Sequence, residues 1–165
     1  MPRRAFYSFH FALDNWRASQ VRNIGAIEGN PTASDNDWEA VKRGGAPAIQ
    51  RWIDDQLLGR GCTIVLIGSE TAGRKWINYE IEKSWNDGKG VLGIHIHGLK
   101  DRNGMQSTRG ANPFDAFTLQ RDKRKLSSIV KAYDSAFWQS TDVYNYISAN
   151  LGDWVETAID IRKNY

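Results

Sequence analysis

The chain has 165 residues, of which 41% are hydrophobic and 25% are charged. This composition excludes a disordered or fibrous protein, and the length suits one domain that buries most of its apolar surface. The formal charge is only +3, from 22 Lys and Arg against 19 Asp and Glu, and the basic residues are scattered along the chain. A nucleic-acid-binding protein is therefore not expected.

The cysteine content and the N-terminal residues predict where the protein is found. Cys62 is the single cysteine and lies inside an apolar run, so it cannot form a disulfide within the chain and indicates a reducing compartment. The first residues lack the apolar stretch of a signal peptide, and no segment approaches the roughly 20 apolar residues that cross a bilayer. We therefore expect a cytoplasmic protein without a membrane partner.

Strand and helix patterns alternate through the first two thirds of the chain. The runs at 62–67 and 91–96 are continuously apolar, which is typical of strands covered on both faces, and the first of them should be central. The alternation predicts an α/β fold in which helices cover both faces of a mostly parallel sheet. The expected elements are a strand at 5–9, a helix from 14 to between 25 and 29, a loop at 28–37, a helix at 47–59, a strand at 62–67, a helix at 75–86 and a strand at 91–96.

The last third of the chain is less regular. Residues 98–113 are too polar and glycine-rich for regular structure, and apolar residues between 130 and 138 predict an edge strand or a packing segment. Apolar residues at spacings of three and four then predict a long helix at 141–163, with Gly152 as a point of interruption. No linker or repeat divides the chain, so residues 1–165 are expected to form a single domain.

The helix expected at 75–86 has an apolar face and, next to it, a face that carries an aromatic ring and a carboxylate. Ile77, Ile81 and Trp85 form a stripe that should pack on the sheet. Trp76 and Glu80 are four residues apart and share the adjacent face, so an indole ring and a carboxylate can point into one cleft.

Such a pair suits the bond between nicotinamide and ribose. The indole can lie against the positive nicotinamide ring, while the carboxylate binds ribose hydroxyls and stabilises an oxocarbenium-like charge. The alternative is that Trp76 is a packing residue and Glu80 a solvated acid on the helix surface. The spacing alone does not decide between these interpretations.

Ligands of an open α/β sheet bind beyond the carboxyl ends of its strands. The segments expected there are residues 8–10, 68–75 and 95–97. Residues 68–73 resemble a phosphate-binding loop before a helix, but they lack the Gly-Lys-Ser/Thr ending of a P-loop, and a plain turn explains them equally well.

Other polar residues carry weaker signals. His10, His95 and His97 are not accompanied by a cluster of Cys or Asp, so no metal site is predicted. Arg17 and Arg22 on the first helix could meet phosphates, although such residues are more often solvated or paired with surface acids.

Several segments together resemble the TIR-like proteins of bacterial Thoeris antiphage systems. The resemblance covers about residues 3–115, and it includes the Trp-x-x-x-Glu helix and an Asn-Pro-Phe-Asp segment in the expected order. Between residues 28 and 45 the chain shows no recognisable BB-loop motif, so its mode of self-association stays open. The segments that carry the resemblance are residues 4–11, 63–71, 75–81, 93–96 and 112–115.

The resemblance implies a flavodoxin-like TIR fold that consumes NAD as a substrate, needs no cofactor and releases nicotinamide. It further implies a cyclic ADP-ribose isomer that activates a separate effector protein. Glu80 occupies the position of the catalytic glutamate, and Trp76 that of an aromatic residue in the substrate pocket. Ser8, Phe9 and His10 match the substrate-binding loop after the first strand.

Other functions remain compatible with this topology. They are a non-catalytic TIR adaptor that acts by self-assembly, a plain NAD glycohydrolase, and a nucleotide-binding or response-regulator-like module. A response regulator would need an Asp at the end of the middle strand, where Gly68 and Ser69 stand instead. Seven tryptophans are many for this length, and most are expected in the core or an interface, so a homo-oligomer is a further expectation.

Overall fold

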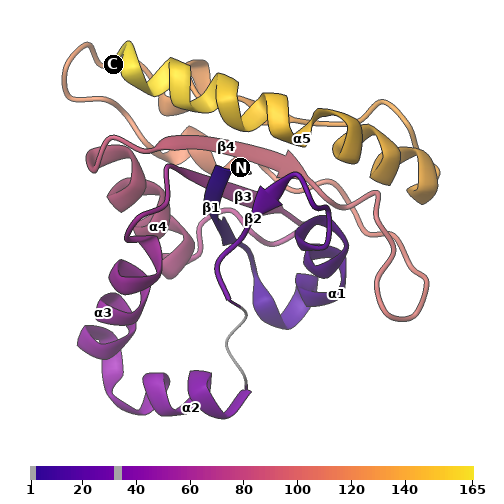
Figure 1. The fold of residues 1–165 in the computed structure, drawn as a ribbon, viewed down its shortest axis with the longest axis horizontal. Coiled ribbons are helices and arrows are strands. Elements are labelled where there is room, and N and C mark those ends of the chain that lie inside the picture. The colour runs from indigo at the N-terminus through magenta and orange to yellow at the C-terminus, as the bar shows by residue number, and fades with distance from the viewer. Residues whose placement is uncertain (1–2, 32–34) are drawn as a thin grey trace.

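A computed structural model of the chain describes residues 3–31 and 35–165 (Figure 1). Strands and helices alternate along most of its length. The elements are β1 (Arg3–Ser8), α1 (Phe11–Arg22), β2 (Ile27–Glu28), α2 (Asp35–Arg43), α3 (Gly45–Leu57), β3 (Cys62–Ile67), α4 (Lys75–Asn86), β4 (Gly90–His95), the 3-10 helices η1 (Pro113–Ala116) and η2 (Leu126–Ser128), β5 (Ala132–Tyr133) and α5 (Ser140–Lys163).

The strands form one parallel sheet in the order β2-β1-β3-β4-β5. The apolar run at 62–67 forms β3, which is central and buried along its whole length, and 91–96 is displaced by one residue from β4. Cys62 in β3 is a free, buried thiol, and burial raises its pKa. Both buried strands expected from the sequence are therefore confirmed.

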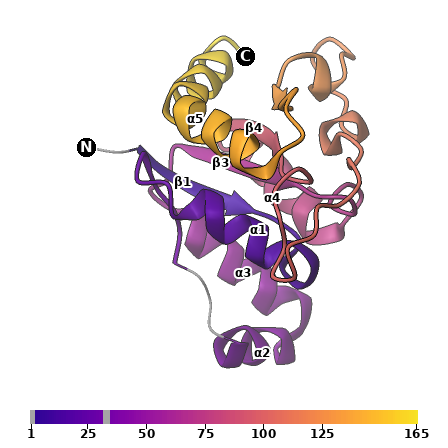
Figure 2. The ribbon, with the colours of Figure 1, turned by 90° about the vertical axis from the view of Figure 1, so that its right-hand side faces the viewer.

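Side chains alternate between the two faces of the sheet, and each face has its own helices. On β3, Ile64 and Leu66 join one hydrophobic cluster with α1 and α5, whereas Val65 and Ile67 join another with α4. Figures 1 and 2 show α5 along one side of the sheet and α3 and α4 on the other. The α/β, flavodoxin-like fold with helices on both faces is thus confirmed.

The region between β1 and α3 differs from the prediction. α1 begins at Phe11 and ends at Arg22, and Ile27 packs as a strand residue of β2 instead of extending the helix. The loop expected at 28–37 contains the end of β2 and the start of α2, and its residues 32–34 lie outside the described part of the chain. Helix α2 was missed because its first residues, Asp-Asn-Asp, are typical of turns.

The C-terminal third adds one long helix and one short edge strand. Helix α5 runs without interruption through Gly152, so the interruption expected there is wrong. Its buried face packs over β4, and Trp154 stacks on Tyr133 of the edge strand β5, with ring centroids 4.2 Å apart. Residues 98–112 are irregular, as predicted. That residues 1–165 form a single domain stays a prediction.

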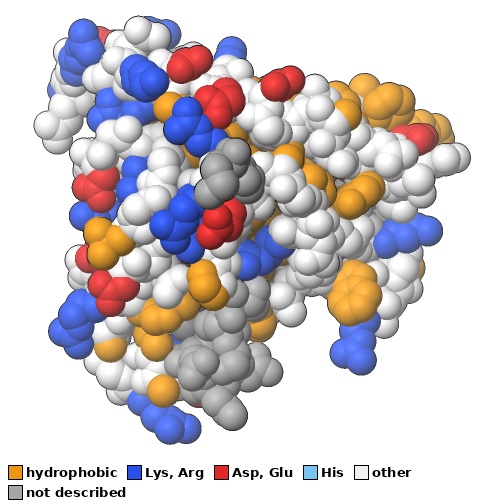
Figure 3. Space-filling model, viewed as in Figure 1, with side chains coloured by type: hydrophobic (Ala, Val, Ile, Leu, Met, Phe, Trp, Pro, Cys, Tyr) orange, Lys and Arg blue, Asp and Glu red, His pale blue; other side chains and the backbone are white. Residues whose placement is uncertain are grey.

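Exposed aromatic side chains bear on the expectation that most tryptophans lie in the core or in an interface. Trp16 is 53% exposed and Trp138 is 87% exposed, so these tryptophans are not core residues. Phe137 is also exposed, and Figure 3 shows hydrophobic side chains gathered where the chain enters α5. Whether an interface covers them stays a prediction.

Within the described residues, none of the helices is both long and apolar enough to cross a bilayer.

Candidate active site

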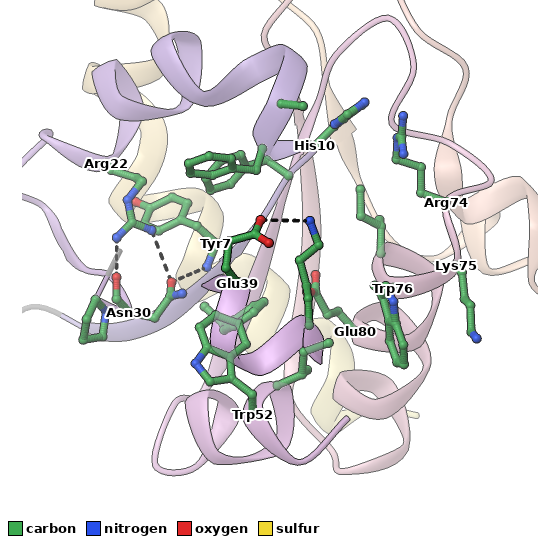
Figure 4. Close-up of a pocket in the computed structure, with 18 residues that line it drawn as sticks. Tyr7, His10, Arg22, Asn30, Glu39, Trp52, Arg74, Lys75, Trp76 and Glu80 are labelled. Carbon is green, nitrogen blue, oxygen red and sulfur yellow. Dashed lines mark hydrogen bonds and ion pairs between the residues drawn. The ribbon is translucent and has the colours of Figure 1, made fainter. Parts of the chain in front are cut away.

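A cavity of about 610 Å³ lies beyond the end of β1 (Figure 4). Its walls come from the end of β1, the beginning of α1, helices α2 and α3, and the first turns of α4. Gly73, which has a φ of 85°, turns the chain into α4 and so places the first residues of this helix at the cavity. The site thus lies at the carboxyl end of β1, as expected for a parallel sheet.

Glu80 is the carboxylate of this cavity, and it is only 9% exposed. Burial raises the pKa of Glu80 to about 8, and a hydrogen bond from the Ser8 hydroxyl to Oε2 opposes part of that rise. One turn further along the helix, the hydroxyl of Ser84 donates to the Glu80 backbone carbonyl at 2.6 Å. Glu80 is therefore a buried cavity residue, and the interpretation as a solvated surface acid is wrong.

Trp76 lines the same cavity from one turn nearer the start of α4. Its ring is half-buried, packs against a cluster that contains Phe6 and Ile53, and meets Tyr79 edge-on with centroids 5.8 Å apart. The stripe of Ile77 and its neighbours on α4 faces the sheet, as the spacing predicted. Trp76 consequently packs on one side and borders the cavity on the other.

The three residues at the end of β1 have different places. Phe9 and His10 line the cavity, and burial is the main cause that lowers the pKa of His10. Ser8 is 1% exposed, and its hydroxyl is directed at Glu80. A substrate-binding role for these three residues stays a prediction, and for Ser8 the observed contact is with the carboxylate.

The other two expected segments contribute little to the cavity. Of residues 68–75, only Arg74 and Lys75 line it. The Gly68 amide donates to the Thr71 hydroxyl at 2.8 Å, so the loop after β3 uses this group within its own turn. The geometry favours the plain strand-to-helix turn.

The histidines at the end of β4 lie outside the cavity wall. His95 is buried, and burial lowers its pKa to about 4, so the ring is neutral at pH 7. Across residues 3–31 and 35–165, no three or more His, Cys, Asp or Glu side chains converge as the ligands of a metal ion would.

Both arginines of α1 are more buried than the solvated side chains expected, although Arg17 does pair with acids, with Asp14 at 3.4 Å and with Asp101 at 3.8 Å. Arg17 is 3% exposed and donates to the backbone carbonyls of Leu99 and Met105, which fastens α1 to the loop after β4. Arg22 lies over the Tyr7 ring at 5.2 Å and donates to Asn30. Arg17 is structural, whereas Arg22 belongs to the cavity wall.

The wall opposite α4 was missed by sequence reasoning. It includes Trp52 of α3, Glu39 and Lys42 of α2, and Asn30. The Asn30 side chain accepts a hydrogen bond from the Tyr7 amide at 2.9 Å, which connects this wall to β1. No local signal marks these residues, because only the crossing from β2 through α2 and α3 to β3 brings them over the end of β1.

Comparison with known proteins places the chain in a family. Residues 6–101, more than half of the chain, match the family described as "Thoeris protein ThsB, TIR-like domain". The chain belongs to this family. The matched residues of the ThsB TIR-like domain include Ser8, Phe9, His10, Trp76 and Glu80.

A curated relative belongs to the same group of proteins. The protein named "Putative cyclic ADP-D-ribose synthase ThsB1", from Bacillus cereus (strain MSX-D12), is 38% identical over 125 residues. The match covers 73% of this chain and 65% of the relative, so the chain spans slightly less than two thirds of the length of that protein.

Proposed function

We propose that the chain cleaves NAD at the bond between nicotinamide and ribose and closes the ADP-ribose part into a cyclic nucleotide. The observation that carries the proposal is the buried carboxylate of Glu80 beside the Trp76 ring in a cavity of about 610 Å³. Membership in the ThsB TIR-like family and the similarity to a relative named as a cyclic ADP-D-ribose synthase support it.

In the first step the bond from the ribose carbon to the nicotinamide nitrogen breaks. Nicotinamide leaves as a neutral molecule with the bonding electron pair, and the ribosyl carbon becomes cationic. The ionised carboxylate of Glu80 stabilises this charge in a site of low dielectric. Before NAD binds, the raised pKa of about 8 keeps much of Glu80 protonated at pH 7, and a positive nicotinamide ring beside it favours the ionised form.

In the second step a nucleophile of the adenosine half attacks the same carbon. An attacking hydroxyl oxygen forms the new bond and loses its proton. An attacking adenine ring nitrogen has no proton to lose, so the adenine becomes cationic and releases a proton from its amino group. Either route converts NAD into a cyclic nucleotide, nicotinamide and one proton. Attack by water would give linear ADP-ribose instead. Aromatic residues line the cavity, among them Phe6, Phe9 and Phe11, and a surface that excludes water favours cyclisation.

The proposal extends to the role in the cell. The cyclic product would activate a separate effector protein in antiphage defence. NAD would be consumed as the substrate, and side chains of the protein itself would bind it and promote the reaction. Its location would be the cytoplasm, where the buried thiol of Cys62 stays reduced. Homo-oligomer formation belongs to the same proposal.

The test compares the parent chain with Glu80→Gln. We expect the parent to release nicotinamide and to form a cyclic product, and the variant to lose both, because an amide cannot carry the stabilising charge. The variant should be at least as stable as the parent, since it removes a buried ionisable group. Both proteins are assayed purified and in phage-challenged cells, with mass spectrometry of the product and a melting temperature as control.

Three other outcomes would contradict part of the proposal. Linear ADP-ribose alone, which is heavier than the cyclic form by one water, would make the chain a plain NAD glycohydrolase. Equal turnover by a folded Glu80→Gln variant would remove Glu80 from the mechanism. A folded parent without turnover in either setting would favour the non-catalytic adaptor.

A further inference from the structure

Two tryptophan rings flank Glu80 from different helices. Figure 4 shows Trp76 of α4 on one side of Glu80 and Trp52 of α3 on the other. Trp52 is half-buried. Ile53, which follows it, and Leu57 are fully buried and pack with Phe6 in one hydrophobic cluster. The ring of Trp52 therefore borders the cavity at the edge of this cluster.

The spacing of the two rings is held by contacts between their helices. The Tyr79 hydroxyl of α4 donates to Asp54 Oδ1 of α3 at 2.6 Å. Ile53 and Leu57 anchor α3 on Phe6 of β1. Because these contacts involve residues next to the tryptophans, the two rings form opposite walls of a preformed site.

Positive side chains line the cavity and favour an anionic ligand, although Lys75 lies over the Trp76 ring at 5.0 Å and not between the two rings (Figure 4). These side chains include Lys42, Arg74 and Lys75, and Glu39 is paired with Lys42 at 3.3 Å. Both members of that pair are about half exposed, so the pair is weak, and Lys42 can turn to a bound phosphate. Arg22 already donates to Asn30 and helps to form the wall.

A dinucleotide has a base at each end and a pyrophosphate in the middle. Its nicotinamide must lie near Trp76 and Glu80 if the bond beside it is to break there. Every base has a π-face that can stack on an aromatic side chain, so the Trp52 ring offers a second place for a base. A molecule bound at both rings would be folded around Glu80, with its anionic middle near the cations.

We propose that the Trp52 wall is a stacking site for adenine, which holds the dinucleotide folded and thereby sets the share of cyclic product. The inference rests on the proposed function for its effect on products, although adenylate binding can be tested without turnover. Adenine held in the same cavity as the bond that breaks would keep the adenosine half at a high effective concentration beside the ribosyl carbon. Without this site, water reaches that carbon more often.

The first experiment measures binding to the whole chain by calorimetry, with AMP and nicotinamide mononucleotide as probes. Trp52→Leu keeps an apolar side chain but removes the π-face, and Trp52→Phe restores one. We expect Trp52→Leu to weaken AMP binding about tenfold or more, while Trp52→Phe stays close to the parent. Nicotinamide mononucleotide should bind equally to all three. The matched control is Trp138→Leu, because Trp138 is exposed and does not line this cavity.

The second experiment measures products from NAD. In Trp52→Leu the ratio of cyclic to linear product should fall several-fold at every NAD concentration, whereas nicotinamide release should fall at low NAD, because binding is weaker, and recover at saturating NAD. Equal AMP affinity in folded Trp52→Leu and parent, or no AMP binding by the parent, would overturn the inference. If AMP binding depends on Trp52 but no variant cleaves NAD, the stacking site stands and the proposed function fails.

Discussion

At Glu80 the fold places a carboxylate where burial opposes its charge. Ser8 and Ser84 both contact this residue, but in different ways. The Ser8 hydroxyl donates to the carboxylate and lowers its pKa, against the larger opposite effect of burial. The Ser84 hydroxyl donates to the backbone carbonyl and also contacts Thr63 at 2.7 Å, which holds α4 against β3.

The pH dependence of turnover should separate these two serines. If the ionised form of Glu80 is the active one, kcat/KM, which depends on the free protein, rises with pH through its pKa of about 8. Ser8→Ala removes a hydrogen bond to the ionised carboxylate, so the pKa of Glu80 rises further. The rising part of the curve of activity against pH then moves to higher pH. The other charged side chains that line the cavity are unchanged in this variant: Arg22, Glu39, Lys42, Arg74 and Lys75.

The measurement is kcat/KM for nicotinamide release from about pH 6 to pH 10. At neutral pH the Ser8→Ala variant should be slower, about tenfold if its Glu80 pKa rises by about one, and the rates should converge at high pH. Ser84→Ala is the control, because its hydroxyl does not touch the carboxylate. Identical profiles for parent and Ser8→Ala would show that Ser8 does not act through the pKa of Glu80.

Trp76→Ala tests the ring beside the carboxylate. The substitution should reduce NAD turnover at least about tenfold, because a cation–π and stacking surface is lost at the leaving group. The half-buried ring should cost less stability than the roughly 3–5 kcal/mol of a fully buried aromatic residue. Turnover and urea denaturation are measured together. An unfolded variant would mean that the packing role dominates.

Between elements, helix α5 approaches strand β4 closely at Gly90. A Cβ added at Gly90 would lie 2.8 Å from the backbone nitrogen of Ile159 and 2.9 Å from the carbonyl carbon of Ala158. Backbone atoms of a packed helix cannot rotate away as a side chain can. The absence of a side chain at Gly90 therefore lets α5 sit directly on the strand.

Gly90→Ala should destabilise the fold by about 1–3 kcal/mol, because α5 must move away from β4. Gly25→Ala is the matched control, since a Cβ there meets nothing within 4 Å, and its effect should stay within about 0.5 kcal/mol. The free energy of unfolding in urea gives both values. Equal stability of the two variants would show that the contact between helix and strand is not tight in solution.

In the molecule as a whole, one sheet supports both hydrophobic layers. Alternate residues of β3 enter the layer with α1 and α5 and the layer with α4. Arg3 at the start of β1 bonds Glu156 of α5 at 2.7 Å, so residues far apart in the chain are joined. Neither layer can open without exposing the shared strands.

The shared sheet predicts that unfolding is a single cooperative transition. The calorimetric and van't Hoff enthalpies should agree, and fluorescence and circular dichroism should report the same midpoint. This measurement also tests the expectation that residues 1–165 form one domain. Two separate transitions, with the C-terminal third melting first, would contradict it.

The sequence by itself determined the elements with strong local patterns. The runs at 62–67 and 75–86 predicted β3 and α4 with the correct bounds, because continuous burial and helical periodicity are local properties. The four-residue spacing also placed Trp76 and Glu80 on one helix face. The family resemblance was visible in the same segments.

Only the tertiary structure decided the environment of that face. Whether Glu80 is solvated or buried depends on Ser8, which is 72 residues away in the sequence, and on the wall formed by α3. The burial of Arg17 likewise depends on carbonyl groups of the loop after β4. Periodicity describes neighbours along one helix, whereas the exposure and the pKa of a side chain follow from whichever other segments the sheet topology packs against it.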